Sequence, residues 1–462
     1  MKLQRIISVN PSKNYEIIGE VDSSTSSQID HKVQLAREAQ KDWALLSIKE
    51  RIIYLEKVYQ ALFRRKDEIR DIASKEMGMP RSIADIIDIE VGFKYMRGYL
   101  DYAEKWLEPE ITFENNSEIH YLTFEPKGVV GASVPWNFPF TIFVWSVIQN
   151  LIVGNTVVFK HSEECILTGK LLETIVKSTD LSDGVFHEVY GDGATTGEYL
   201  LNSNVDLIWF TGSTGVGKHI YQVAAKKFVP VILELGGSSP GIVFQDANLD
   251  IAIKSIYSYR FYNSGQSCDA LKRLIVHESI FDDTVQRLKN LIETKSIGCA
   301  QDTQTDIGPL AAERQLISLE KQVQDALDKN ARVIIGAKRP DNLQGAYYEP
   351  TILTNISFDM KVWKEEVFGP VLPIVPFKTE QEAISLANDT IYGLGGYVYT
   401  QDIERAMRIS KALKTGNINV NNADYNIPEN PFGGYKYSGM AREHGKIGLR
   451  DLCNIKIIAT KK

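Results

Sequence analysis

The chain has 462 residues, of which 44% are hydrophobic and 24% are charged, a composition typical of a folded globular protein. Its 52 lysines and arginines are outnumbered by 59 aspartates and glutamates, so the net charge is −7. This balance gives no electrostatic reason to expect a nucleic acid or an anionic membrane as a partner. The length is enough for about two to four domains.

Neither a disulfide framework nor a membrane span is expected. The four cysteines (Cys165, Cys268, Cys299 and Cys453) include no CxxC pair, which indicates a reducing compartment. No apolar region follows the basic N-terminal residues, so no signal peptide is predicted. The most hydrophobic stretch, residues 138–153, contains polar residues and is shorter than the ~18 apolar residues of a membrane span. We therefore predict a buried helix there and a cytoplasmic protein.

The first hundred residues are predicted to be helical. Ser27 and Asp30 have the spacing of a helix-capping motif. Apolar residues then recur at helical intervals, as in Val33, Ala36 and Trp43.

From residue 128 the pattern changes to short apolar runs that alternate with amphipathic segments. The predicted strands are 128–134, 155–160, 185–190, 205–211 and 229–235, separated by helices at 138–153, 165–178, 194–202 and 214–227. A second series has strands at 241–244, 273–277, 332–336, 371–377, 395–399 and 417–420 and helices at 278–294, 311–329, 379–388 and 402–413. This alternation predicts two α/β domains with parallel sheets covered by helices. A final strand at 452–460 needs a pairing strand, for which a partner subunit is one candidate.

Cys268 is the first candidate for chemistry. It lies in the polar loop Asn-Ser-Gly-Gln-Ser-Cys-Asp, residues 263–269, between a helix and a strand. Backbone N–H groups in such a loop can stabilise a thiolate and make it a nucleophile. The alternative is an inert, packed thiol, which is also the interpretation of the other three cysteines. His161 and Cys165 are four residues apart, but two ligands do not make a metal site, so no metal is expected.

Two polar residues follow predicted strands of the first domain. Glu234 ends strand 229–235 before a Gly-Gly turn, where α/β active sites form, and burial there would raise its pKa toward that of a general base. Asn137 stands between two prolines (Pro135 and Pro139) that fix the backbone, and its amide is a neutral donor suited to an oxyanion. A hydrogen-bonded turn carboxylate and a simple turn asparagine are the alternatives.

Two further features suit a phosphate or a ribose. Residues 210–218 run from a strand into a helix with three glycines, so the helix N-terminus can face a phosphate. The segment matches neither GxGxxG nor a Walker A loop, because His219 follows Lys218. Lys160, at the end of a strand, can hold a ribose or phosphate or simply be solvated.

Together these motifs resemble the NAD(P)-dependent aldehyde dehydrogenase superfamily. The segments that carry the resemblance follow the family's order and spacing over essentially the whole chain: Pro135–Pro139, Lys160–Glu163, Phe210–Gly217, Leu233–Gly237, Gly265–Cys268, Glu365–Pro370 and Pro431–Lys436. Lys160-His161, residues 233–238 and the ending 448–455 are most similar to short bacterial succinate-semialdehyde dehydrogenases.

The resemblance implies an α/β fold with three parts. These are a Rossmann-like parallel-sheet cofactor domain (1–111 and 128–238), a second α/β catalytic domain (239–445) and a small β oligomerisation arm (112–127 and 446–462). It also implies a homodimer or homotetramer, with residues 119–124 and 452–460 at the contacts.

The resemblance assigns catalytic roles. The residue that matches Cys268 would attack the aldehyde carbon, and the oxyanion would be held by the Asn137 side chain and the Cys268 backbone N–H. Hydride transfer to the nicotinamide would leave a thioester, and Glu234 would activate the water that hydrolyses it, which favours hydrolysis over transfer to coenzyme A. A non-catalytic binding or structural relative is the alternative from another class. Loss of one of these three residues would indicate it, and all three are present.

The cofactor site implied by the resemblance is larger. Lys160 and Glu163 would contact the adenosine ribose, Ser213 the pyrophosphate, and Glu366 and Phe368 the nicotinamide riboside, with Trp136, Gly212 and Gly236 completing the set. Glu163 would accept a hydrogen bond from a ribose 2′-hydroxyl but repel a 2′-phosphate, so NAD is expected and NADP is the alternative. His161 departs from the family, in which many members have proline.

The implied substrate tunnel gives two alternatives. Its lining residues would be Phe138, Ile142, Trp145, Ser267 and Asp269. The resemblance favours succinate semialdehyde, but Trp145 stands where those enzymes often carry an arginine for the substrate carboxylate. Asp269 and Glu429 would favour a neutral or amino-aldehyde if they point inward. The alternative is that both carboxylates are solvated.

Overall fold

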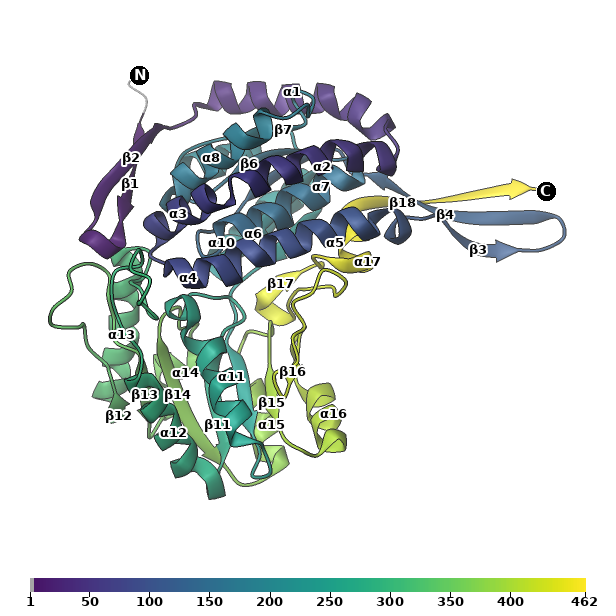
Figure 1. Ribbon diagram of the computed structural model, residues 1–462. Helices are drawn as coiled ribbons and strands as arrows, with labels where there is room; N and C mark the ends of the chain where they lie inside the picture. The colour runs from purple at the N-terminus through teal and green to yellow at the C-terminus, as the bar shows by residue number, and fades with distance from the viewer. Residues whose placement is uncertain (1–3) are drawn as a thin grey trace.

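The structure, a computed structural model, describes residues 4–462, which form two mostly parallel sheets, an N-terminal hairpin and a projecting three-stranded arm (Figure 1). The six-stranded sheet has the order β17 (Gly439–Met440), β9 (Val231–Glu234), β8 (Leu207–Thr211), β5 (Val129–Ser133), β6 (Thr156–Lys160) and β7 (Phe186–Glu188). Its neighbouring strands are parallel except for β17, which is antiparallel to β9.

Helices cover both faces of this sheet, because successive strand residues point to opposite sides and both sets are apolar. Val129, Val158 and Ile208 pack with α1 (Ser26–Leu45), α9 (Glu198–Asn202) and α10 (Thr214–Lys227). Val130 and Trp209 belong to the larger core on the other face. The helices of that core are α2 (Ile48–Arg64), α3 (Lys66–Met77), α4 (Arg81–Ala84), α5 (Val91–Trp106), α6 (Pro139–Phe143), α7 (Gln149–Val153) and α8 (Ile166–Lys177).

The buried helix predicted at 138–153 is present. A π-helical turn at Val144–Ile148 joins α6 to α7, and Pro139 begins α6, where its missing N–H costs no helical hydrogen bond. No helix within residues 4–462 is long and apolar enough to cross a membrane.

The seven-stranded sheet forms the second α/β unit. Its order is β12 (Arg332–Ile335), β13 (Thr351–Thr354), β14 (Val371–Phe377), β11 (Leu271–His277), β10 (Ser239–Val243), β15 (Tyr397–Tyr399) and β16 (Asn419–Val420), and only the pairing of β12 is antiparallel among these described strands. One face packs on α11 (Leu249–Phe261) and α12 (Phe281–Glu293), and the other on α15 (Glu380–Asn388) and α16 (Ile403–Ala412). A separate core beside β13 and β14 contains α13 (Glu313–Asp328) and α14 (Lys361–Lys364).

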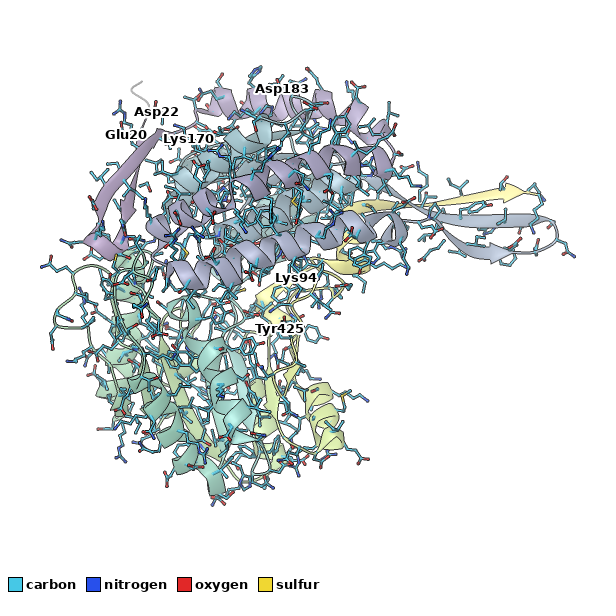
Figure 2. All side chains as sticks on the ribbon, viewed as in Figure 1. Glu20, Asp22, Lys94, Lys170, Asp183 and Tyr425 are labelled. Atoms are coloured by element: carbon cyan, nitrogen blue, oxygen red, sulfur yellow. The ribbon has the colours of Figure 1, made fainter. Side chains whose placement is uncertain are left out.

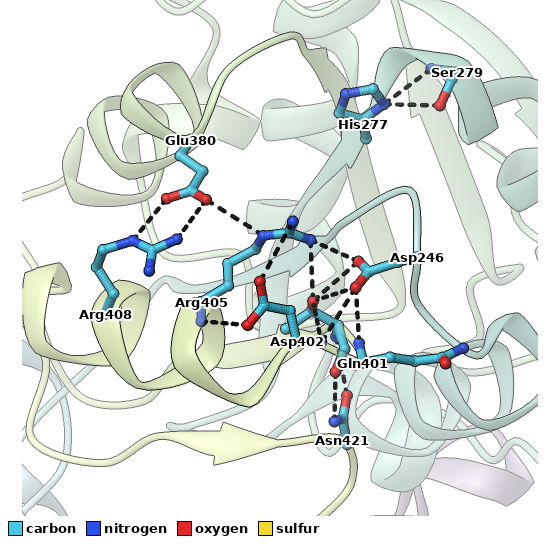
Figure 3. Close-up of polar contacts among 10 residues, drawn as sticks. Asp246, His277, Ser279, Glu380, Gln401, Asp402, Arg405, Arg408 and Asn421 are labelled. Atoms are coloured by element: carbon cyan, nitrogen blue, oxygen red, sulfur yellow. Dashed lines mark hydrogen bonds and ion pairs between the residues drawn. The ribbon is translucent and has the colours of Figure 1, made fainter.

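An ion-pair cluster fixes α16 to this sheet (Figure 3). Arg405 of α16 donates to Asp246, which follows β10, at 2.8 Å, and its Nε lies 3.3 Å from Glu380 of α15. Arg408 donates to Glu380 at 2.8 Å, and Asp402 caps α16 by accepting from the Arg405 N–H at 2.9 Å. The Arg405 side chain is only 18% exposed, so it joins three elements with little competition from water.

The arm is an antiparallel sheet with the order β18 (Cys453–Lys461), β4 (Glu118–Pro126) and β3 (Glu110–Glu114), and it projects away from both α/β units (Figure 1). The predicted terminal strand is therefore present, but it finds its pairing strand within the same chain: Cys453 lies opposite Pro126 and Lys461 opposite Glu118.

Two sequence predictions need correction. Residues 5–22 are not helical but form the antiparallel hairpin β1 (Arg5–Asn10) and β2 (Glu16–Asp22), and along β1 exposed and more buried side chains alternate. The capping box of α1 uses Thr25 and Gln28 instead of Ser27 and Asp30. Residues 439–440 form β17 in the six-stranded sheet, and α17 (Gly445–Asp451) packs against α5. The domain boundaries stay predictions.

Candidate active site

A cavity of about 430 Å³ lies where the two sheets meet. The carboxyl ends of β5, β6, β8 and β9 share one sheet edge, and β10 starts directly after the loop that follows β9. The wall includes Asn137, Trp145, Glu234, Cys268, Asp269 and Glu366. Figure 2 shows Lys94 and Tyr425 at this junction. The sequence therefore brings its candidate catalytic residues into one cavity.

The loop before Cys268 has a strained backbone. Asn263, Ser264 and Gly265 have φ values of 47°, 53° and 75°, the left-handed region that non-glycine residues adopt at a cost of about 1–2 kcal/mol each. Hydrogen bonds hold this turn: the Ser264 hydroxyl donates to the Gly308 carbonyl at 2.8 Å, and Gln266 donates to the Asn263 carbonyl at 3.1 Å. The loop thus presents the following cysteine from a fixed backbone.

The Cys268 thiol is half-buried on the cavity wall. Burial raises its pKa well above the ordinary value, and the negative charges of Glu234 and Asp269 raise it further, while Lys272 opposes them. The resting thiol is therefore protonated at neutral pH, so a nucleophilic role requires a base beside it.

Glu234 supplies a carboxyl group at that position. The side chain ends β9, is 3% exposed, and its Oε1 has no hydrogen-bond partner within residues 4–462. Burial raises its pKa well above the ordinary value, the carboxyls of Glu443 and Asp269 add to this, and the Cys268 thiol opposes it. A carboxyl with a raised pKa at a cavity wall suits general-base chemistry.

Glu443 is a second buried carboxyl that sequence reasoning missed. It is 2% exposed, neither carboxyl oxygen has a hydrogen-bond partner in the described chain, and burial raises its pKa to about 8. β17 brings it there, since Gly439 pairs with Glu234. No local pattern marks this residue, because its burial depends on a strand pairing between distant segments.

Asn137 is held from two sides. Its Nδ2 donates to the Gln266 carbonyl at 3.1 Å, and Asn263 Nδ2 donates to the Asn137 carbonyl at 2.9 Å. The side chain is 3% exposed and lines the cavity, so one amide proton is fixed and the second remains available to an oxygen placed there.

The other end of the cavity is organised by Glu366. Its Oε1 accepts from Lys272 at 2.6 Å and from the Gly237 N–H at 3.0 Å. A Cβ on Gly236 would lie 2.2 Å from Glu366 Oε2, so any larger residue there would displace the carboxylate of Glu366. Phe368 meets Trp136 edge-on, with ring centroids 5.6 Å apart. Gly212 and Ser213 line the same cavity, and Ser213 caps α10.

Lys160 and Glu163 lie outside this cavity wall. Lys160 is 2% exposed, its ammonium donates to the His161 carbonyl at 3.0 Å and lies 3.7 Å from Glu163 Oε2, and burial lowers its pKa. A buried ammonium with spare protons beside a half-buried carboxylate fits ribose hydroxyls, which both donate and accept. Lys160 and Glu163 at one place, and the glycine cradle formed by Gly236 and Gly237 beside Glu366 at another, together fit a dinucleotide.

The predicted tunnel residues also meet. Phe138, Ile142, Trp145, Ser267 and Asp269 all line the cavity. Asp269 points inward and is 6% exposed: its Oδ1 accepts from the Ser267 hydroxyl at 2.7 Å and its Oδ2 from the Tyr425 hydroxyl at 2.9 Å. Glu429 is instead exposed and is not part of the wall, as expected for a solvated carboxylate.

The family profile of the aldehyde dehydrogenases matches residues 2–458. The chain belongs to the aldehyde dehydrogenase family. Aminoaldehyde dehydrogenase 1, peroxisomal, of Pisum sativum is 36% identical over 98% of this chain and 92% of its own length. Succinate-semialdehyde dehydrogenase, mitochondrial, of Arabidopsis thaliana is also 36% identical, over 98% of this chain and 86% of its own length.

The fold matches solved members of the family. The NAD⁺ complex of an aldehyde dehydrogenase from Bacillus cereus superimposes with a TM-score of 0.95 and 30% identity, covering 99% of this chain and 93% of that one. The aldehyde dehydrogenase described here is therefore an NAD(P)-dependent oxidoreductase of small aldehydes. One relative is named for amino-aldehydes and the other for succinate semialdehyde, and both are 36% identical, so overall similarity does not distinguish between these two substrate classes.

Proposed function

We propose that this aldehyde dehydrogenase oxidises a short amino-aldehyde to the corresponding carboxylic acid with NAD. The observation that carries the proposal is Asp269, a buried carboxylate on the cavity wall directly after the nucleophile candidate. The Ser267 and Tyr425 hydroxyls keep it in place. Burial raises the pKa of the nearby Tyr262 hydroxyl, and the charge of Asp269 raises it further. The negative charge of Asp269 makes the electrostatic potential in this part of the cavity negative, which favours a substrate that carries a protonated amine.

The charges around the cavity support this choice. Within the described residues, Lys94 is the only lysine or arginine of the wall; it is exposed, and its ammonium donates to the Asn426 carbonyl at 3.3 Å. Asp424 is also exposed on the wall. A like charge about 6 Å from Asp269 would cost roughly 3 kcal/mol at an effective dielectric constant of 20. A short substrate whose aldehyde sits at Cys268 cannot place a carboxylate far from Asp269.

The proposed chemistry uses three side chains in turn. Glu234 takes the Cys268 proton, the sulfur adds to the aldehyde carbon, and Asn137 Nδ2 with the Cys268 N–H holds the resulting oxyanion. NAD, when bound, accepts the hydride. Glu234 releases the proton of Cys268 to solvent and then takes a proton from the water molecule that attacks the thioester on Cys268. The C–S bond breaks, the carboxylic acid leaves, and Glu234 returns this proton to the departing sulfur, so that the thiol re-forms.

NAD is proposed over NADP because of Glu163. With Glu163 beside the buried Lys160 ammonium, a ribose 2′-hydroxyl finds both a donor and an acceptor, whereas a 2′-phosphate would meet a carboxylate. Replacing Glu163 with glutamine should therefore improve kcat/KM for NADP relative to NAD.

Succinate semialdehyde is the second candidate. The relative from Arabidopsis thaliana and the exposed Lys94 at the cavity favour it. Trp145 opposes it, since a carboxylate would find an indole whose ring packs 4.6 Å from that of His444.

A substrate panel tests the proposal. The kcat/KM values for 3-aminopropanal, butanal and succinate semialdehyde are measured by NADH absorbance for the wild type, Asp269→Asn and Trp145→Arg. We expect the wild type to prefer the amino-aldehyde, and both variants to shift the ratio toward succinate semialdehyde by about tenfold. Cys268→Ala should abolish turnover. Preference of the wild type for succinate semialdehyde, or an unchanged ratio in both variants, would overturn the substrate assignment.

We also propose a homodimer or homotetramer held together through the arm. Ile455, Ile457 and Ile458 of β18 and Ile111 and Phe113 of β3 are exposed on it, more apolar surface than an isolated ribbon normally leaves in water. Charged substitutions at Ile455 and Ile457 should lower the mass seen by light scattering. The four free thiols support the proposed cytoplasmic location.

A further inference from the structure

His161 and Glu188 form a buried pair beside the candidate site. Both side chains are fully buried, and His161 Nδ1 lies 2.9 Å from Glu188 Oε1. The other ring nitrogen, Nε2, lies 3.2 Å from the Pro139 carbonyl oxygen. Neither the proposed chemistry nor the cofactor set uses this pair.

The partners of His161 fix where its protons are. A carbonyl oxygen only accepts, so Nε2 must donate to Pro139. The remaining contact, between Nδ1 and Glu188 Oε1, then contains one proton, carried by either the ring or the carboxyl group. In both arrangements the pair is neutral and the ring makes two directed hydrogen bonds, so its orientation is fixed.

The pair lies between two parts of the site. His161 directly follows Lys160, whose ammonium donates to the His161 carbonyl at 3.0 Å. Pro139, two residues after Asn137, begins α6. The ring of His161 thus connects the end of the loop that holds Asn137 to the end of β6, while Glu188 anchors it from β7, where it pairs with Phe159.

Close packing prevents the side chains of His161 and Glu188 from adopting another arrangement. Helix α8 packs so closely that a Cβ on Gly169 would lie 2.0 Å from Glu188 Oε1 and 2.7 Å from His161 Nδ1. Asp88 holds the same start of α6 by accepting from the Thr141 N–H at 2.8 Å. Movement of the ring would therefore displace the Pro139 carbonyl, the α8 backbone or both.

We propose that His161 and Glu188 act as a positioning pair that sets the Asn137 loop against Lys160, so that the oxyanion donor and the cofactor are held in one geometry. This inference rests on the roles proposed above for Asn137 and Lys160. A displacement of the loop by about 1 Å is enough to lower the rate about a hundredfold, so a residue that touches neither substrate nor cofactor can matter to both.

Four variants of the full-length protein test the pair. His161→Phe keeps the ring shape but removes both hydrogen bonds and leaves Glu188 unpaired. His161→Phe with Glu188→Leu removes the unpaired carboxyl as well, which should restore stability without restoring the contact to Pro139. Glu188→Gln keeps both contacts, because its amide can donate to Nδ1. His161→Gln keeps a donor that can reach the Pro139 carbonyl.

Three quantities are compared: the midpoint of thermal unfolding, kcat/KM for 3-aminopropanal, and the dissociation constant of NAD. The last is measured by tryptophan fluorescence and needs no turnover. For the double variant we expect an unfolding midpoint close to the wild type, with kcat/KM at least about tenfold lower and NAD binding several-fold weaker. Glu188→Gln should stay within about twofold of the wild type in all three, and His161→Gln should regain part of the loss.

Two results would overturn the positioning role. One is recovery of kcat/KM together with stability in the double variant, which would make the pair purely structural. The other is a Glu188→Gln enzyme as impaired as His161→Phe. Asn137→Ala and Lys160→Ala, measured alongside, separate this failure from that of the proposed function: if they leave kcat and NAD binding unchanged, the roles assigned to those two residues fail instead.

Discussion

The ammonium group of Lys272 donates to Glu366 Oε1 at 2.6 Å and also to the carbonyl oxygens of Gly237 and Cys268, at 2.8 and 2.9 Å. One buried cation therefore joins the loop of the proposed nucleophile, the turn after the proposed base and the carboxylate at the proposed nicotinamide end. It is also the positive charge that opposes the rise in the pKa of the Cys268 thiol.

Replacing Lys272 with methionine should make the Cys268 thiol harder to ionise. Loss of the nearby positive charge raises the thiol pKa further, so the midpoint of the pH dependence of alkylation by iodoacetamide should move upward by about one pH unit or more. Lys338→Met, a change at an exposed lysine, is the control. An unchanged alkylation profile in Lys272→Met would contradict the electrostatic role.

Glu234→Gln should slow both steps that the proposed base serves. Without it the Cys268 thiol ionises less readily, so the burst of about one NADH per active site should develop more slowly than in the wild type. No base then activates water, so the acyl group stays on Cys268, and we expect a steady rate at least about a hundredfold lower than in the wild type. Intact-mass spectrometry should show the acyl adduct, and Cys268→Ala should show neither burst nor adduct. Steady turnover at the wild-type rate would exclude Glu234 as the base.

Glu443 should make the protein less stable as the pH rises. Its pKa is raised to about 8 in the folded state, so the folded protein retains a proton that the unfolded chain has already lost. Stability therefore falls between the ordinary glutamate pKa of 4.5 and about 8, by up to about 1.4 kcal/mol per pH unit. Glu443→Gln should raise the unfolding midpoint at pH 8 but change it little at pH 5.

The same substitution has a kinetic consequence. A neutral side chain at position 443 removes a charge that raises the pKa of Glu234, so the acid limb of the kcat profile should move to lower pH. Glu429→Gln, at an exposed carboxylate, serves as the control for both measurements. A stability difference that is the same at pH 5 and pH 8 would show that Glu443 does not titrate as described.

Gly236→Ala should weaken NAD binding. The added methyl group would lie 2.2 Å from Glu366 Oε2, so the carboxylate and its contact with Lys272 must shift, an overpacking cost of about 1–3 kcal/mol. The dissociation constant of NAD should rise about tenfold or more, as measured by fluorescence titration. Gly396→Ala is the matched control, since its nearest neighbours would be 3.4 Å away. Equal dissociation constants of NAD in the two variants would contradict a role of Gly236 in cofactor binding.

Most of the fold follows from local patterns. The strands of both sheets are short apolar runs because helices bury both their faces, and the intervening helices have a clear period, so the α/β alternation was predictable. The hairpin at residues 5–22 was not, because its strands are short and lie mostly at the surface, and polar and apolar residues do not alternate regularly along them. β17 has two residues, too few for any period.

The site likewise contains residues that the sequence could predict and residues that it could not. Glu234 and Asn137 stand in recognisable motifs at or just after strand ends, and Cys268 stands in a polar, glycine-containing loop, so the sequence could predict them. Lys272 looks like any strand lysine, and Tyr425 like any loop tyrosine. Their functions depend on contacts with Glu366 and Asp269, which lie 94 and 156 residues away in the chain. Such pairs arise only when the distant segments of the seven-stranded unit come together.

The last residues of the chain also constrain how the protein can be made. β17 completes the edge of a sheet whose other strands are all synthesised before residue 235, and β18 completes the arm begun at residue 110. A ribosome-bound chain must therefore carry two unpaired strand edges, on β9 and β4, until residues 439–461 have been made. Pairings this distant in sequence slow folding, and they make the first 240 residues a poor fragment to express alone.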